Sequence, residues 1–221
     1  MENAKISNLY DLEQTIAKEY LEQFTYPWEA LGGISEYIKK LGPTLDPEKF
    51  EQRGEYIWIA KSAKIAPTAY IGGPLIIDEE AKVLHCAFVR ENAIIGRGAV
   101  VGNSTELKNV ILFNSVEAPH YNYVGDSILG YKAHMGAGAI TSNLKADKKS
   151  VVIKDKEEQI ATGIRKIGAM LGDYAEIGCN SVLNPGTIVG RHSNVYPTSC
   201  VRGVIPANCI YKSKTEIMEK H

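Results

Sequence analysis

The sequence predicts an all-β fold in which the chain winds into a parallel β-helix, and three observations lead to this prediction. The first is a six-residue repeat: nine aliphatic residues follow one another at intervals of six over residues 59–107. The second is that the residue four positions after each aliphatic one is mostly small, as at Ala63 and Ala69. The third is that the same pattern returns over residues 171–201.

A period of six is typical of neither an α-helix, which repeats every 3.6 residues, nor an ordinary strand, which repeats every two. It fits one side of a triangular coil, where a short strand points its aliphatic residue inward and the small residue occupies the corner. Three sides make a coil of about 18 residues, and stacked coils pair their strands in parallel about 4.8 Å apart. Since one coil cannot bury its own core, the coils must stack.

Composition and charge exclude several classes of protein. The chain has 221 residues, is 44% hydrophobic and 23% charged, and carries a net charge of −1, so no global field favours nucleic acid or an anionic membrane. No apolar run approaches the roughly 18 residues of a membrane span, and the first residues lack the apolar core of a signal peptide. We therefore expect a cytoplasmic protein without a nucleic-acid or membrane partner.

The four cysteines form no C-x-x-C pair, and a chain of this length needs no disulfide framework. We expect small buried thiols, and a free catalytic thiol is the alternative.

The repeat also divides the chain into parts. Residues 1–55 show helical spacing at Leu9, Leu12 and Ile16, and the helical pattern ends at Gly42 and Pro43. We expect this part to be a small helical cap over the open end of the coil, where it would cover the core and an unpaired strand edge. A role in substrate closure or in assembly is the alternative. Residues 56–211 form the coil, and residues 212–221 are expected to be a short helix or tail.

Two interruptions of the repeat are expected to loop out of the coil, over residues 113–122 and 144–166. From Leu107 to Leu129 the spacing is 22 residues instead of 24, so the phase of the repeat slips there. The second interruption contains two short strand-like segments around a charged turn. Loops on a rigid scaffold often carry the functional side chains, so the site is expected near these two segments.

The first interruption contains a motif that resembles a known family. Residues 119–126 read P-H-Y-N-Y-V-G-D, similar to the P-H-x-x-Y-x-G-D signature of hexapeptide-repeat acetyltransferases. The resemblance is to the acetyltransferase domain of bacterial bifunctional N-acetylglucosamine-1-phosphate uridyltransferases and to the C-terminal tails of archaeal sugar-1-phosphate nucleotidylyltransferases. It implies a left-handed β-helix, an exception to the right-handed rule for parallel crossovers. It also implies that His120 is the general base and that Tyr123 contacts the substrate.

Further positions match the same family. The resemblance implies that Arg90 and Lys108 contact a substrate phosphate, that Asn143 contacts the sugar, and that Lys149 is near a later substrate lysine. Residues 135–141 resemble the family's I-G-A-G-T-I-T segment, which implies acetyl-CoA as co-substrate. The expected donor-binding residues are Gly136, Ala137, Cys179 and Pro197.

These residue types suit transfer of an acetyl group to an amino-sugar phosphate. A protonated amine must lose a proton before it attacks a thioester, and an imidazole is the usual base near neutral pH. Arginine and lysine bind phosphate, and a backbone N–H in residues 136–138 is suited to an oxyanion. Since Arg90 and Lys108 are one full coil apart, we expect them to stack one rung apart and to face one anion.

The resemblance implies a homotrimer, and the flat faces of a triangular coil suit side-by-side packing with cyclic closure. The bacterial enzymes of this family also carry a nucleotidyltransferase domain. Residues 1–55 of this chain contain no Gly-rich phosphate loop, so we expect no nucleotidyltransferase domain here.

Two other functions remain open. One is a non-catalytic binding or oligomerisation module, which the sequence N-L-K-A at residues 143–146 favours because the family reads N-Y-D-G there. The other is a γ-class carbonic anhydrase, since His85 and His120 are 35 residues apart. Val124 and Gly125 stand where the third histidine ligand would be, so we expect no metal.

Overall fold

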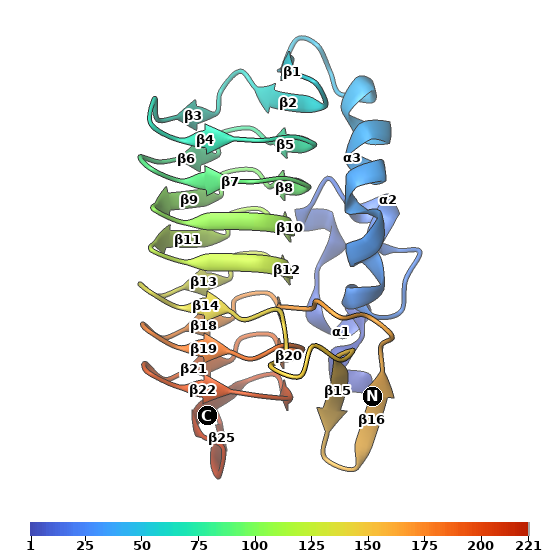
Figure 1. Cartoon of the computed structure of the whole chain (residues 1–221), viewed down its shortest axis with the longest axis vertical. Helices are drawn as coiled ribbons and strands as arrows, with labels where there is room; N and C mark the ends of the chain where they lie inside the picture. Colours follow the sequence, from blue (N-terminus) through green and yellow to red (C-terminus); the bar gives the residue numbers. More distant parts are fainter. Residues whose placement is uncertain (221) are drawn as a thin grey trace.

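The computed structural model describes residues 1–220 and shows a left-handed parallel β-helix with a helical segment along one side (Figure 1). The left-handed β-helix that the sequence and the family resemblance predict is confirmed. Each coil has three faces, which we call the helix-covered face, the polar face and the open face. The helix-covered face contains β2 (Ile57–Ala60), β5 (Leu75–Ile77), β8 (Ala93–Ile95), the second halves of β10 (Glu106–Leu112) and β12 (Tyr123–Leu129), β17 (Ala169–Leu171), β20 (Thr187–Val189) and β23 (Val204–Ile205).

The other two faces carry shorter strands. The polar face contains β3 (Lys64–Ile65), β6 (Lys82–Val83), β9 (Val100–Asn103), β11 (Glu117–His120), β13 (His134–Met135), β18 (Glu176–Ile177), β21 (Asn194–Val195) and β24 (Cys209–Ser213). The open face contains β4 (Tyr70–Ile71), β7 (Phe88–Val89), the first halves of β10 and β12, β14 (Ile140–Thr141), β19 (Val182–Leu183) and β22 (Cys200–Val201).

The register explains the slip in the repeat. Leu75 pairs with Ala93, a spacing of 18 residues, whereas Ala93 pairs with Val110 and Val110 with Ser127, spacings of 17. Two successive coils are thus one residue shorter than the 18-residue coils that precede them. The prediction of a looped-out insertion at residues 113–122 is wrong, because this segment forms β11 and pairs with β9 and β13.

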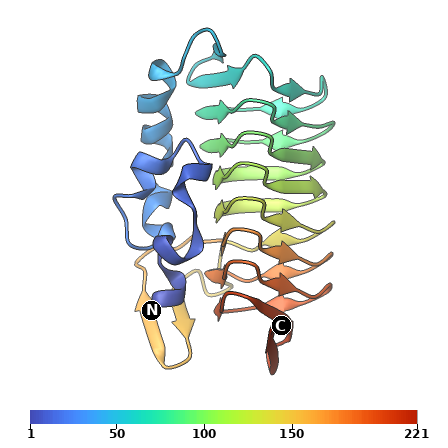
Figure 2. The ribbon, with the colours of Figure 1, turned by 180° about the vertical axis from the view of Figure 1, so that it is seen from behind.

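The N-terminal segment lies along the flank of the coil, not over its end as we expected (Figure 2). Its α3 (Ile34–Leu41) packs on β8 and β10, and its η3 (Pro27–Gly33) packs on β12. The elements of this segment are η1 (Glu2–Ala4), α1 (Ile6–Leu9), η2 (Leu12–Gln14), α2 (Lys18–Leu21), η3 (Pro27–Gly33), α3 (Ile34–Leu41) and η4 (Gly42–Thr44).

An outward aliphatic stripe on the helix-covered face is the physical reason for this position. In β5, Ile77 points into the core, so its neighbour Ile76 must point outward, because successive strand residues face opposite sides. The residues at this outward position are fully buried all the same: Ile76, Ile94, Ile111, Ile128, Met170 and Ile188. The helical segment covers them and removes a long apolar surface from water.

The two ends of the coil are covered by antiparallel strands. At the first coil, β1 (Phe50–Gly54) pairs with β2, and at the last coil β25 (Glu216–Glu219) pairs with β24. The expected C-terminal helix is therefore absent from residues 212–220, since the edge of β24 is satisfied by a strand; His221, the last residue of that expectation, lies outside the described residues. The segment at 144–166 does leave the coil, as the hairpin β15 (Val152–Asp155) and β16 (Glu158–Ala161).

A buried carboxylate fastens the helical segment to the coil. The side chain of Asp173 accepts hydrogen bonds from the backbone N of Asp11 (2.7 Å) and of Tyr131 (2.8 Å), and pairs with Arg191 (2.9 Å). The backbone N of Asp173 in turn donates to Leu9 O (2.9 Å). One residue of the coil thus ties three distant parts of the chain together.

We expect Ile94→Ala to lower the free energy of unfolding by about 2–5 kcal/mol, because it leaves a cavity beneath α3. Denaturant unfolding measures this loss. The control is Val100→Ala on the polar face, which is partly exposed and should cost less than about 1 kcal/mol. Equal losses at both positions would contradict the covering role of the helices.

Candidate functional site

The open face is bordered by two corners that collect the expected site residues. The first, which we call the His120 corner, is where the polar face turns into the open face. Here Gly138 N donates to His120 O (3.0 Å) and Asn180 N donates to Ala137 O (2.8 Å). One coil further, Thr198 N donates to Cys179 O (2.8 Å). The structure therefore stacks the expected base and the expected donor-binding residues in one column: His120, Gly136, Ala137, Cys179 and Pro197.

A buried amide that the sequence motif leaves unspecified fixes this corner. The side chain of Asn122 is 2% exposed. Its Nδ2 donates to Gly136 O (2.9 Å) and Ala139 O (3.0 Å), and its Oδ1 accepts from His120 N (3.0 Å). Asn122 thus links the His120 turn to the next coil and keeps the exposed imidazole at a defined place.

Only one backbone donor of the glycine-rich turn is available to a ligand. Gly136 N donates to Ile177 O (2.7 Å), and Gly138 N is used by His120 O. The N–H of Ala137 has no hydrogen-bond acceptor among residues 1–220. It lies one rung from His120 and is the donor in this turn that an oxyanion can use.

The second corner, which we call the Lys108 corner, is where the open face turns into the helix-covered face. Arg90 N donates to Leu107 O (3.0 Å), and Val89 pairs with Leu107. Arg90 and Lys108 therefore lie one rung apart at the same corner, which confirms the stacking expected from their spacing.

Asp126 is the centre of the Lys108 corner, although the motif alone assigns it no role. It is 3% exposed, and its Oδ1 accepts from Lys108 Nζ (3.0 Å) and Asn109 Nδ2 (3.0 Å). Asn143 Nδ2 donates to its Oδ2 and to the hydroxyl of Tyr123 (3.1 Å). Three of the expected substrate-binding residues are thus joined in one hydrogen-bonded network.

The charges of this corner are already balanced, which corrects the expectation of two free cations facing one anion. Lys108 pairs with Asp126, and Arg90 pairs with Glu106 (3.0 Å) and with Glu91 (3.6 Å). A phosphate that binds here must share these cations with carboxylates or displace them.

Burial, and then the carboxylates of Asp126 and Glu106, raise the pKa of Tyr123 above its ordinary value. Its hydroxyl consequently remains protonated at neutral pH and can donate a hydrogen bond to a ligand.

Lys149 is not brought to either corner. It lies in an exposed loop where its backbone N donates to Asp147 Oδ1 (3.0 Å), and no hydrogen bond or ion pair of its side chain is found within residues 1–220. The lysine beside Asn143 is instead Lys166, because Leu144 bridges to Lys166 and Ile167 N donates to Asn143 O (3.0 Å). The return of the segment at residues 144–166 to the coil places Lys166 there, which sequence spacing does not reveal.

The open face between the two corners carries an uncovered and mainly apolar ladder. Tyr70 and Phe88 are 60% and 42% exposed, and their rings meet edge to face with centroids 5.3 Å apart. The outward residues of this face are Tyr70, Phe88, Glu106, Tyr123, Ile140, Val182 and Cys200. The polar face, by contrast, presents mostly charged and polar side chains such as Lys82, Glu117 and Glu176.

No group of three or more His, Cys, Asp and Glu side chains in residues 1–220 is arranged to hold a metal ion. No helix within these residues is long and apolar enough to cross a bilayer.

In sequence, the chain is similar to the GMPPB C-terminal domain and to bifunctional proteins. The family model of the GMPPB C-terminal domain matches residues 71–164. The chain is 33% identical over 216 residues to the bifunctional protein GlmU of Methanococcus maripaludis, an alignment that covers 89% of this chain and 46% of that protein. It is 31% identical over 165 residues to a bifunctional sugar-1-phosphate nucleotidylyltransferase/acetyltransferase of Sulfurisphaera tokodaii, covering 75% and 40% of the two chains.

Among solved structures, perosamine N-acetyltransferase from Caulobacter crescentus aligns with a TM-score of 0.38 at 17% identity, covering 86% of this chain and 66% of that one. The chain spans about half the length of the GlmU relatives it matches. By its repeat and its coil the chain is a hexapeptide-repeat left-handed β-helix protein, and in sequence it is similar to the bifunctional proteins GlmU.

Proposed function

We propose that this chain is an acetyl-CoA-dependent N-acetyltransferase that acts on an amino-sugar 1-phosphate. The observation that carries the proposal is the arrangement of the open face. A histidine and a free backbone N–H border one edge, a network of Lys108, Asp126 and Asn143 borders the other, and the first half of β12 separates the two. The name of one relative, a bifunctional sugar-1-phosphate nucleotidylyltransferase/acetyltransferase, supports the same reaction.

The proposed reaction uses the residues of both corners. The sugar phosphate binds at the Lys108 corner, with the Tyr123 hydroxyl donating to a sugar oxygen and Asn143 Oδ1 accepting from a sugar hydroxyl, and its amine points toward His120. The imidazole takes a proton from the protonated amine, and the neutral nitrogen then attacks the thioester carbonyl. The N–H of Ala137 stabilises the oxyanion that forms. The C–S bond then breaks, the departing thiolate takes the proton from the imidazolium, and the freed imidazole takes the second proton from the nitrogen of the new amide.

We further propose that the open face assembles the chain into a homotrimer. Of the three faces, one is covered by the chain's own helices and one is polar, which leaves the apolar ladder of the open face for a neighbouring copy. Packing of this ladder against a neighbour would bury the exposed rings of Tyr70 and Phe88 and would shield the site from water.

A non-catalytic binding or oligomerisation module is the second candidate function. The ion pairs of Arg90 with Glu106 and of Lys108 with Asp126 favour it, because they stabilise the corner without a ligand. Release of free thiol from acetyl-CoA, measured across a panel of amino-sugar phosphates, separates the two functions. Acceptor-dependent thiol release supports the enzyme, and its absence with every acceptor supports the module.

His120→Ala is expected to lower turnover about 10²- to 10⁴-fold at neutral pH, the usual effect of losing a general base. The deficit should shrink as the pH rises, since the substrate amine then loses its proton without help. Thiol release measured over a range of pH tests both points. His192→Ala, a histidine stacked on Tyr174 away from the open face, is the control and should keep wild-type turnover. Wild-type turnover in His120→Ala at neutral pH would exclude this residue as the base.

Lys108→Ala is expected to raise KM for the sugar phosphate roughly ten- to a hundredfold, equivalent to about 1.5–3 kcal/mol for one charge-assisted bond. Arg90→Ala should act in the same direction. Turnover should change less, and KM for acetyl-CoA should stay the same, because neither residue lies in the His120 column. Lys82→Ala on the polar face is the matched control. A larger effect on acetyl-CoA than on the sugar phosphate would contradict the assignment.

In solution scattering the chain is expected to have about three times its monomer mass of 24.3 kDa. Phe88→Asp should shift the mass toward the monomer, since it places a charge in the apolar ladder. Lys82→Asp, which changes the polar face of the same coil, should leave the mass unaltered. A wild-type protein that remains monomeric at micromolar concentration would refute the trimer.

A further inference from the structure

The hairpin β15–β16 encloses a cavity against the lower coils, at the corner where the open face turns into the helix-covered face. The cavity has a volume of about 490 Å³, within the range of small-molecule sites. We call it the hairpin pocket and define it by its four cations, Lys145, Lys154, Arg202 and Lys214. Lys145 and Lys154 come from the insertion, while Arg202 and Lys214 come from the last coils and the turn that follows them.

The hairpin is held directly against two corner glycines, so the pocket is formed before any ligand binds. Val151 and Ile153 are each 1% exposed. Gly186 has φ +80°, and a Cβ there would lie 2.6 Å from Val151 Cγ1. Gly203 has φ +79°, and a Cβ there would lie 2.9 Å from Lys154 O. Any side chain at either glycine would push the hairpin away from the coil.

The positive charge of this pocket is largely uncompensated. Within residues 1–220, no carboxylate lies at ion-pair distance from Lys154, Arg202 or Lys214, and Lys145 pairs only with Asp147 (3.3 Å). This differs from the Lys108 corner, where each cation has a carboxylate partner. In a chain with a net charge of −1, such a concentration of cations around a concave surface creates a positive potential that attracts a polyanion.

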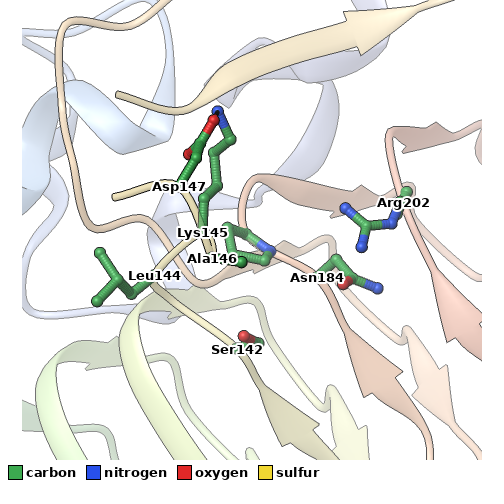
Figure 3. A pocket seen from close by; sticks show the side chains of 8 residues that line it. Ser142, Leu144, Lys145, Ala146, Asp147, Asn184 and Arg202 are labelled. Atoms are coloured by element: carbon green, nitrogen blue, oxygen red, sulfur yellow. Dashed lines mark hydrogen bonds and ion pairs between the residues drawn. The ribbon is translucent and has the colours of Figure 1, made fainter. Parts of the chain in front are cut away.

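A neighbouring hollow of about 510 Å³ shares Lys145 and Arg202 with the pocket and extends it toward the open face. Figure 3 shows Arg202 and Asn184 rising from the coil opposite the Lys145–Asp147 segment of the insertion. Ser142, which precedes Asn143 of the Lys108 corner, lines the same hollow. The cations are thus connected by a continuous surface to the site described above.

We propose that the hairpin pocket binds the diphosphate of a nucleotide. Several cations around one cavity suit a diphosphate better than a single carboxylate, and arginine can bind its oxygens in a bidentate manner. The apolar side chain of Val152 lines the same cavity and is 37% exposed, so it offers a surface for a ribose or base. The diphosphate has two possible sources: a nucleotide sugar, or the coenzyme A of the acetyl donor. The second source rests on the function proposed above, and the first does not.

Isothermal titration calorimetry with UDP and with coenzyme A, in the absence of any acetyl acceptor, tests the proposal. At least one of the two should bind saturably to the wild type, and Arg202→Gln and Lys154→Gln should each weaken that binding at least tenfold. The matched control is Arg165→Gln, an exposed arginine of the same insertion that donates to Lys148 O and does not line the pocket; it should bind as the wild type does. Circular dichroism verifies that the variants are folded.

The outcomes distinguish a nucleotide sugar from coenzyme A as the source of the diphosphate, and they test the hairpin pocket separately from the acetyltransferase activity. Binding of UDP that depends on Arg202 identifies a nucleotide sugar, whereas coenzyme A binding with the same dependence and no UDP binding identifies the acetyl donor. Absence of binding for both probes overturns the proposal. It is overturned equally by binding that ignores Arg202→Gln and Lys154→Gln, or that weakens as much in Arg165→Gln. Because binding is measured without turnover, a failure of the acetyltransferase assay leaves this result intact.

Discussion

Every structural feature of this protein depends on parallel pairing between successive coils, because a single coil cannot bury its own aliphatic residues. The pairing fixes the inward ladder, and by alternation it also fixes which side chains point outward on each face. Each outward ladder of side chains must then be either covered by protein or exposed to water, according to its polarity. On one face the aliphatic ladder is covered by α1–α3, on the second a polar ladder meets water, and on the third an apolar ladder remains uncovered. The polarity of the outward side chains therefore decides what lies against each of the three faces.

The proposed catalytic arrangement is a consequence of the same stacking. Residues one coil apart in the sequence become neighbours along a corner, so a base, a turn with a free N–H and a polar network can each occupy one column. Asn122 and Asp126 show how these columns are held: both are buried, and their hydrogen bonds between coils fix the His120 backbone and the Lys108 side chain. In the proposed function His120 and Lys108 act on the substrate, and their buried neighbours Asn122 and Asp126 hold them in place.

The two cationic regions of the chain differ in their electrostatics. At the Lys108 corner the cations are paired with carboxylates, which stabilises the empty corner and obliges a phosphate to compete for them. In the hairpin pocket the cations face a cavity without such partners among the described residues. The first arrangement favours selection among ligands that also hydrogen-bond to Tyr123 and Asn143, and the second favours electrostatic attraction of a polyanion.

The sequence by itself determined the repeat, the coil, the corner that holds His120 with Gly136, and the stacking of Arg90 on Lys108. These features follow from a local period, since residues 17 or 18 apart become neighbours wherever the coil continues. Tertiary structure alone decided the rest. The helical segment lies on the flank because the outward stripe from Ile76 to Ile188 must be buried, and the sequence repeat records the inward positions more clearly than the outward ones. Residues 113–122 remain in the coil because shortened coils keep the pairing. Lys166, and not Lys149, lies beside Asn143, because the end of an insertion is positioned by where the chain rejoins the coil and not by its distance along the sequence.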